Sequence, residues 1–275
     1  MTRTVDRKPS TRGRATRVDP VTQTLVFAAH KGGSGKTTAA VNVAGCAADL
    51  GHKVLLVDVD PQGAATAAVG GADTKPTLYE VLAGRASLDE AVRPSSVKGL
   101  DLLPADLDLA GAELELPRRA QWQTALRAAL APAAGRWELV VLDSAPGLGV
   151  LPFVALAAAD RAVVTSPPTF LSIRAMRHLL ATVDQAAGFA PGLEVIGVVP
   201  SIVGRRSLHR DEAMAEMTKR WPKLILPEMP DRVVFADAAV AGQPVVIYAP
   251  TSPAAQAVRA LTKEVLKRAK PPRPS

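Results

Sequence analysis

Short, continuous apolar runs alternate along the chain with longer segments in which apolar residues return every three or four positions. A run of four or five apolar residues is typical of a parallel strand that is covered on both faces. The longer segments have the period of helices that bury one face. The predicted strands lie at residues 25–29, 54–57, 139–143, 162–165 and 195–199, and the clearest helices at 36–50, 169–186, 208–220 and 253–269.

The pattern is less regular between the second and third of these strands. We expect helices at 77–83 and 106–114, a short strand at 100–103 and a longer helix at 118–133. Parallel strands need a crossover between them, which is usually a helix. The alternation therefore predicts an α/β fold: a single domain with a doubly wound, mostly parallel sheet and helices on both faces.

The two ends of the chain differ from its middle. Residues 1–21 are polar and basic without periodicity, so we expect a disordered N-terminal tail, followed by the domain at 22–270 and a C-terminal tail at 271–275. The formal net charge of +7 comes from +4 in residues 1–20 and +4 in residues 262–275, against −1 in between. Such ends are either simply solvated or add attraction to a polyanion.

Composition excludes several classes of protein. Hydrophobic residues make up 48% of the chain, enough for a substantial core. Cys46 is the one cysteine, which excludes a disulfide framework and thiolate zinc sites and favours a reducing compartment. No apolar stretch reaches the roughly 18 residues of a membrane-spanning helix, and we expect no secretory signal.

A glycine-rich loop, His30-Lys31-Gly32-Gly33-Ser34-Gly35-Lys36-Thr37-Thr38, joins the first predicted strand to the first predicted helix. Its glycines let backbone N–H groups point at phosphate oxygens, and the helix N-terminus adds positive charge. Lys36 can reach β- and γ-phosphates, and the Thr37 hydroxyl suits Mg²⁺. We predict a P-loop for a nucleoside triphosphate, with the binding residues Lys31, Gly32, Gly33, Ser34, Gly35, Lys36, Thr37 and Thr38.

Carboxylates follow two further strands at the edge where this loop lies. Asp58 and Asp60 come after strand 54–57, and the carboxyl ends of parallel strands are where ligands bind in such sheets. Asp143 ends strand 139–143 and suits a water-mediated contact with Mg²⁺. The alternative for Asp58 and Asp60 is that they only cap the turn that follows.

These motifs resemble those of the ParA-type partition ATPases, in the deviant Walker A (ParA/MinD) superfamily. The family loop reads KGGxGK[ST], which fits residues 31–37, and its DxDPQGN stretch fits residues 58–64 with Ala64 in place of Asn. Residues 109–116 are similar to the family's LAGAExEL segment. The similarity extends over about residues 24–268 and implies a P-loop fold that binds ATP and Mg²⁺.

The resemblance also implies roles for single residues. Lys31 matches the lysine that crosses a dimer interface to the phosphates of the partner's nucleotide. Asp60 matches the carboxylate that helps to orient the hydrolytic water. The implied catalytic set is Lys31, Lys36, Asp60 and Asp143, with Thr37 and Asp143 on the metal side.

Besides Ala64, three further positions depart from the family pattern. Ala145 replaces the first proline of the family's DxPP, so we expect a less rigid loop after Asp143. The proline and asparagine that flank the adenine in the family correspond to Pro230 and Arg232, which alters the polar partner. A basic position that the family uses for DNA falls on Val234, so that contact is missing.

ParA-type proteins bind DNA without sequence preference as ATP-bound dimers, which requires phosphate contacts from lysine and arginine. Arg206 aligns with a basic residue that the family uses for this purpose. Arg174 and Arg177 have a weaker claim, and a basic helix face can also be merely solvated. The candidate DNA-binding cluster is Arg205, Arg206, Arg210, Lys219, Arg220 and Lys223.

We therefore expect a cytoplasmic, nucleoid-associated, slow ATPase that forms a homodimer with ATP, binds DNA and segregates plasmid or chromosome DNA. Its stimulating partner would be a ParB-like centromere-binding protein or another cargo adaptor. The alternatives are a positioning ATPase for a protein cargo, a MinD-like membrane-associated ATPase and a nucleotide-binding scaffold without turnover. The basic amphipathic helix 253–269 suits a membrane surface, but it lacks large aromatic anchors, and packing onto the sheet is simpler.

Overall fold

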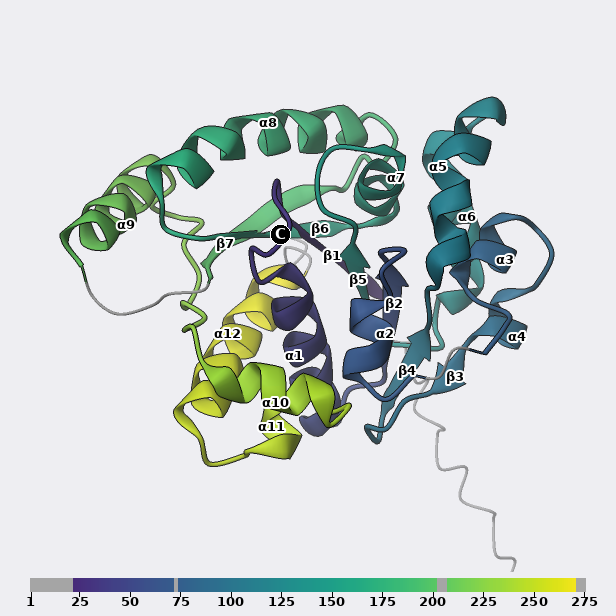
Figure 1. Cartoon of the computed structure of the whole chain (residues 1–275). Helices are drawn as coiled ribbons and strands as arrows, with labels where there is room; N and C mark the ends of the chain where they lie inside the picture. Colours follow the sequence, from purple (N-terminus) through teal and green to yellow (C-terminus); the bar gives the residue numbers. More distant parts are fainter. Residues whose placement is uncertain (1–21, 72–73, 202–206, 271–275) are drawn as a thin grey trace, which may run out of the picture.

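A computed structural model of the chain describes residues 22–71, 74–201 and 207–270. A seven-stranded sheet in the order β3-β4-β2-β5-β1-β6-β7 runs through the molecule (Figure 1), and every neighbouring pair is parallel except β3 and β4. The strands are β1 (Gln23–Ala28), β2 (Val54–Val59), β3 (Arg93–Pro94), β4 (Leu100–Leu103), β5 (Leu139–Ser144), β6 (Arg161–Ser166) and β7 (Glu194–Pro200). The predicted doubly wound α/β fold is confirmed.

Successive residues of the central strands belong to two separate cores, one on each face of the sheet. Val26, Leu55 and Val140 belong to one cluster of buried residues, whereas Leu25, Leu56 and Val141 belong to the other. Side chains alternate between the faces of a strand, so strands covered on both sides are apolar throughout. This explains why β2 and β5 are buried along their whole length.

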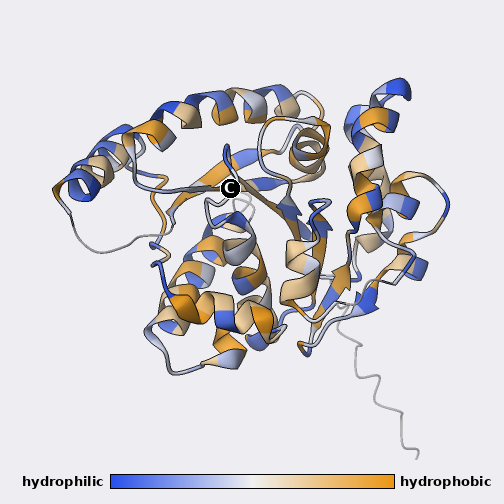
Figure 2. Cartoon of the chain, viewed as in Figure 1, coloured by the Kyte–Doolittle hydropathy of each residue, from blue (hydrophilic) through white to orange (hydrophobic). Residues whose placement is uncertain are grey.

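Helices cover both faces of the sheet (Figure 1). One face packs against α1 (Lys36–Asp49), α2 (Ala64–Ala68), α10 (Val233–Val240), α11 (Val245–Tyr248) and α12 (Pro253–Ala269). The other packs against α3 (Leu78–Leu82), α4 (Leu88–Ala91), α5 (Ala112–Glu115), α6 (Ala125–Leu130), α7 (Val150–Ala158), α8 (Phe170–Ala187) and α9 (Leu208–Arg220). Figure 2 shows long hydrophilic stretches on α8 and α9, as expected for helices that cover the sheet from outside.

The apolar stripe of α12 lies in the core. Val258, Leu261 and Val265 are fully buried, and α12 packs on α1 and α11. The prediction that this stripe packs onto the protein is therefore confirmed, and it is not available to a membrane surface. Among the described residues, no helix is both long and apolar enough to cross a bilayer.

Cys46, the one cysteine of the sequence, is also buried in this layer, on α1. Burial raises the pKa of its thiol above the ordinary value. A protonated, enclosed thiol reacts slowly with reagents in solution.

The expected helix at 118–133 was wrong. The segment folds as separate short pieces: η2 (Leu116–Arg118), η3 (Trp122–Thr124), α6 and η4 (Ala131–Ala133). Gln121 has a left-handed backbone with φ 57°, which interrupts any helix, and prolines stand in the first turns of η2 and η4.

Two described helices of eight or more residues, α7 and α10, were not predicted. The helix α7 is apolar on nearly every side. Seven of its nine residues are buried, and its sequence VLPFVALAA shows no amphipathic period. The predicted tails at 1–21 and 271–275 lie outside the described residues, and the domain boundaries stay a prediction.

Candidate functional site

The glycine-rich loop connects β1 to α1 at the carboxyl edge of the sheet. Gly33 and Gly35 have left-handed backbones, with φ 74° and 77°, and Gly35 is the residue immediately before α1. Glycine adopts this conformation without the strain that a Cβ atom would cause. The Ser201 hydroxyl at the end of β7 donates a short hydrogen bond to the Ser34 carbonyl, which fastens the loop to the sheet.

A buried ion pair stands at the start of α1. The Lys36 ammonium lies 2.7 Å from Oδ1 of Asp143, and the two side chains are 6% and 0% exposed. Burial raises the pKa of Asp143, and Lys36 opposes that rise. The second oxygen of Asp143, Oδ2, is buried and has no hydrogen-bond partner among the residues that the structure describes.

This pair fits the residues expected around Mg²⁺. A buried carboxylate oxygen without a donor is costly, and it is the kind of atom that a metal-bound water satisfies. The Thr37 hydroxyl lies 3.4 Å from the Lys36 ammonium, so Thr37 and Asp143 both adjoin Lys36. The structure thus brings the two predicted metal-side residues together, although their role stays a prediction.

Asp58 and Asp60 end the neighbouring strand. Asp58 is the register partner of Asp143, and it is completely buried. Burial and the charge of Asp143 raise the pKa of Asp58 to about 7. Asp60 is 8% exposed, and its Oδ1 accepts a hydrogen bond of 3.0 Å from the Gln62 backbone N–H. The order β2-β5-β1 therefore gathers Asp60, Asp143 and the glycine-rich loop on one edge.

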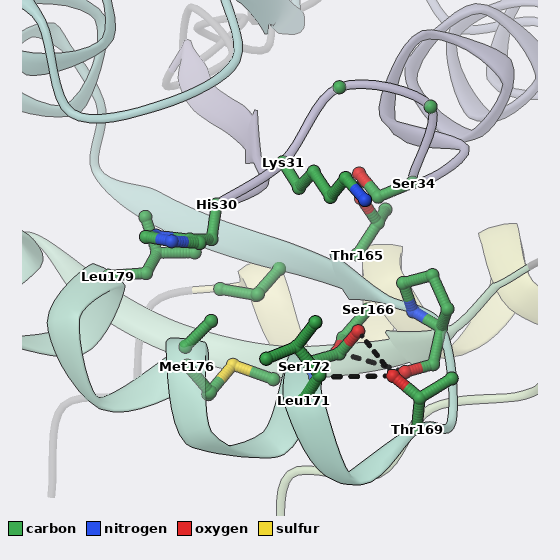
Figure 3. Close-up of a pocket in the computed structure, with 15 residues that line it drawn as sticks. His30, Lys31, Ser34, Thr165, Ser166, Thr169, Leu171, Ser172, Met176 and Leu179 are labelled. Carbon is green, nitrogen blue, oxygen red and sulfur yellow. Dashed lines mark hydrogen bonds between the residues drawn. The ribbon is translucent and has the colours of Figure 1, made fainter.

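A cavity of about 700 Å³ opens between the loop and α8 (Figure 3). Lys31 is exposed at its rim, and the His30 ring lies 6.2 Å from that of His178. Hydroxyl-bearing and apolar side chains both line the cavity. The hydroxyl groups belong to Ser34, Thr165, Ser166, Thr169 and Ser172, and the apolar side chains are Leu171, Met176 and Leu179. Lys31 is therefore accessible from solvent, and its contact with a partner's nucleotide stays a prediction.

The expected adenine contacts lie in the segment after β7. Met229 is buried, and its N–H donates to the Pro200 carbonyl at 2.8 Å, which ties this segment to the strand end. Pro230 is half-buried, and Arg232 is exposed at the N-terminus of α10. Their contact with adenine stays a prediction.

The candidate DNA cluster divides into three groups. Arg205 and Arg206 lie outside the described residues. Arg210, only 18% exposed, donates to Glu228 at 3.2 Å, and Arg220 pairs with Glu216 on α9. Lys219 and Lys223 are exposed and make no ion pair within the described part of the chain. The two lysines are thus better placed than Arg210 to contact phosphate.

Two side chains near the site were not assigned a role from the sequence. The Thr66 hydroxyl donates to Asp58, and the Glu113 carboxylate accepts from the N–H groups of Val150 and Leu151 at the start of α7. Thr66 lies just beyond the 58–64 motif, eight positions after Asp58, whereas Glu113 lies within the 109–116 segment, 37 and 38 positions before its two partners. No local pattern could have identified these contacts.

Known proteins are similar to this chain in sequence and in fold. A family described as an AAA domain matches residues 22–190, more than half of the chain. The chromosome-partitioning ATPase Soj of Thermus thermophilus is 39% identical over 89% of this chain and 95% of Soj, and the chromosome partitioning protein ParA of Caulobacter vibrioides is 35% identical over 89% and 94%. The structure of cobyrinic acid a,c-diamide synthase from Mycobacterium smegmatis with ADP and magnesium has a TM-score of 0.78 at 30% identity, covering 90% of this chain and 94% of that one.

Proposed function

Because this chain belongs to the family of ParA- and Soj-type ATPases, we propose that it binds ATP with Mg²⁺, hydrolyses ATP slowly and segregates DNA. ATP-bound chains pair as a homodimer, the dimer binds nucleoid DNA, and hydrolysis releases it. A ParB-like centromere-binding protein or another cargo adaptor stimulates the hydrolysis.

The buried pair of Lys36 and Asp143 carries this proposal. Lys36 already has an anionic partner in a water-poor site, where a triphosphate would offer it several more negative oxygens. Transfer of the ammonium to the phosphates frees the Asp143 carboxylate, which with Thr37 would hold Mg²⁺. When bound, the metal ion neutralises charge on the β- and γ-phosphates.

The chain's own groups supply the rest of the chemistry. Loop N–H groups and Lys36 stabilise the charge that develops on the transferred phosphoryl group. Asp60 orients the attacking water, since it directly follows β2, the strand beside that of Asp143, and one of its carboxylate oxygens is held by Gln62. Lys31, exposed at the rim of the cavity, reaches the phosphates bound to the second chain.

Phosphate contacts with DNA fall to exposed basic side chains on and after α9, Lys219 and Lys223 among them. The burial of the apolar stripe of α12 speaks against the membrane-associated alternative. Whether the cargo is DNA or a protein depends on which adaptor protein binds to this chain.

The Asp60→Ala chain tests the proposal, because loss of the water-orienting group should trap the ATP-bound dimer. We expect light scattering to show a dimer with Mg–ATP and a monomer with ADP. Only the dimer should bind duplex DNA, and its affinity should be the same for duplexes of unrelated sequence. Asp184→Ala, an exposed aspartate on α8, is the matched control and should turn over ATP as the unmodified chain does. A chain that stays monomeric with saturating Mg–ATP overturns the proposal.

A further inference from the structure

The Asp58 carboxylate accepts three hydrogen bonds that no step of the proposed reaction uses. Its Oδ2 accepts from both the backbone N–H and the hydroxyl of Thr66, each at 2.8 Å. Its Oδ1 accepts from the backbone N–H of Asp60 at 3.1 Å. Thr66 is 3% exposed, so water does not compete for these contacts.

The Thr66 hydroxyl uses both of its hydrogen-bonding roles. It donates its proton to Asp58 and accepts a hydrogen bond of 3.1 Å from the Ala105 N–H, just beyond the end of β4. A hydroxyl has one proton to donate and lone pairs to accept with. One side chain thus joins the end of β2, the start of α2 and the end of β4, the strand beside β2.

Asp60 lies in the chain between Asp58 and Thr66, which these hydrogen bonds join. Its N–H is held by Asp58, and the helix that follows its loop is held through Thr66 to the same carboxylate. Gly63, with a left-handed backbone, turns the chain between them. The backbone that carries the Asp60 carboxylate is therefore fixed at both sides of the turn.

We infer that Thr66 is a positioning residue, whose hydroxyl holds the Asp60 loop in the geometry needed to orient the attacking water. This inference rests on the proposed function for the role of Asp60. A purely structural hydroxyl would affect folding and nucleotide affinity, whereas a positioning hydroxyl affects turnover of bound ATP more than its binding.

Thr66→Val and Thr66→Ser form the decisive pair, because valine has the shape of threonine without the hydroxyl and serine keeps the hydroxyl. We expect Thr66→Val to lower kcat about 10-fold or more, while KM for ATP changes less than about twofold. Thr66→Ser should restore kcat to within about threefold of the unmodified chain. Thr262→Val, a fully buried threonine on α12, controls for the same change elsewhere in the core.

Amide hydrogen exchange without nucleotide separates this inference from the proposed function. Faster exchange at residues 60–66 in Thr66→Val, but not in Thr66→Ser or Thr262→Val, supports the positioning contact even if the unmodified chain hydrolyses no ATP, a result that would overturn only the proposed function. Unchanged exchange in that loop, a kcat of Thr66→Val near that of the unmodified chain, or equal losses in Thr66→Ser each overturn the inference.

Discussion

Asp58 and Asp143, register partners on the neighbouring strands β2 and β5, lie buried together with Lys36 at the start of α1. Two carboxylates and one ammonium leave a surplus of negative charge in a site that excludes water. Such a surplus favours protonation of one carboxylate. Lys36 pairs with Asp143, whereas no basic side chain pairs with Asp58 in the described part of the chain, so the protonated one is Asp58. This surplus of negative charge is unfavourable for folding, but it would attract a cation such as Mg²⁺ to the site.

Asp58 should make the fold less stable as pH rises, which is the reverse of the usual effect of an aspartate. Its pKa is raised to about 7 in the folded chain, so the folded state holds the proton more tightly than the unfolded state does. From about pH 4 to pH 7 its contribution to the free energy of unfolding therefore falls as pH rises, by at most about 1.4 kcal/mol per pH unit. Denaturant unfolding of the unmodified chain and of Asp58→Asn across this range measures the difference in slope.

The slope is the readout, because Asp58→Asn also changes hydrogen bonds by an amount that does not vary with pH. Asp184→Asn, an exposed aspartate on α8, should leave the slope as it is. Parallel curves for Asp58→Asn and the unmodified chain would contradict the prediction.

At the scale of elements, the sequence shows its strands more clearly than its helices. Buried parallel strands are continuous apolar runs, so β1, β2, β5, β6 and β7 could all be predicted from them. The helix α7 lacks the polar face that reveals an amphipathic helix in a sequence, and it was missed. The helix expected at 118–133 is interrupted at Gln121, whose backbone is left-handed. A glutamine in a sequence does not predict this conformation.

The candidate site divides in the same way. Lys36 and the aspartates stand in contiguous motifs at strand ends, and the sequence alone could identify them. Thr66 acts through Ala105, 39 positions away, and that contact exists only because β4 lies beside β2. Long-range hydrogen bonds of this kind follow from the sheet order, which local patterns do not contain.

Glu113 provides the cap for α7 from a different element. Gly149 at the N-cap has no side chain, and the Glu113 carboxylate accepts from Val150 and Leu151 at 2.9 and 3.2 Å. Glu113→Ala should therefore lower the free energy of unfolding by about 1–2 kcal/mol, since two helix N–H groups lose their acceptor. Urea denaturation measures the loss.

Glu113→Gln keeps one oxygen as an acceptor and should lose less. Glu194→Ala, at the exposed start of β7, is the control and should change stability by less than about 0.5 kcal/mol. Equal stability of Glu113→Ala and Glu194→Ala would show that the α7 N-terminus does not depend on this carboxylate.

On the scale of the whole molecule, exposed lysines lie at separate places on the surface. The carboxyl edge holds the glycine-rich loop, whereas Lys53 and Lys98 stand just before β2 and β4, at the opposite edge. Lys219 and Lys223 lie at the end of α9 and beyond it. A surface that binds nucleoid phosphate should therefore be local rather than spread over the molecule.

Replacement of both Lys219 and Lys223 by alanine should weaken DNA binding to the same extent for every sequence. The slope of log affinity against log salt should fall by about 2, since each lost phosphate contact removes about 0.9. Titration of labelled duplexes at several salt concentrations, with Mg–ATP and the Asp60→Ala background, gives this slope. Lys53→Ala with Lys98→Ala removes equal charge and should leave it unchanged; a loss that depends on base sequence would indicate direct readout instead.

The enclosed thiol of Cys46 makes the chain convenient for optical labelling. Because the native sulfur is shielded in α1, a cysteine introduced on the solvent side of α8 or α9 would be the fast-reacting one, and a maleimide dye would attach there without first replacing Cys46. Single-molecule fluorescence could then test whether individual protomers arrive on a stretched duplex, pair and depart as proposed.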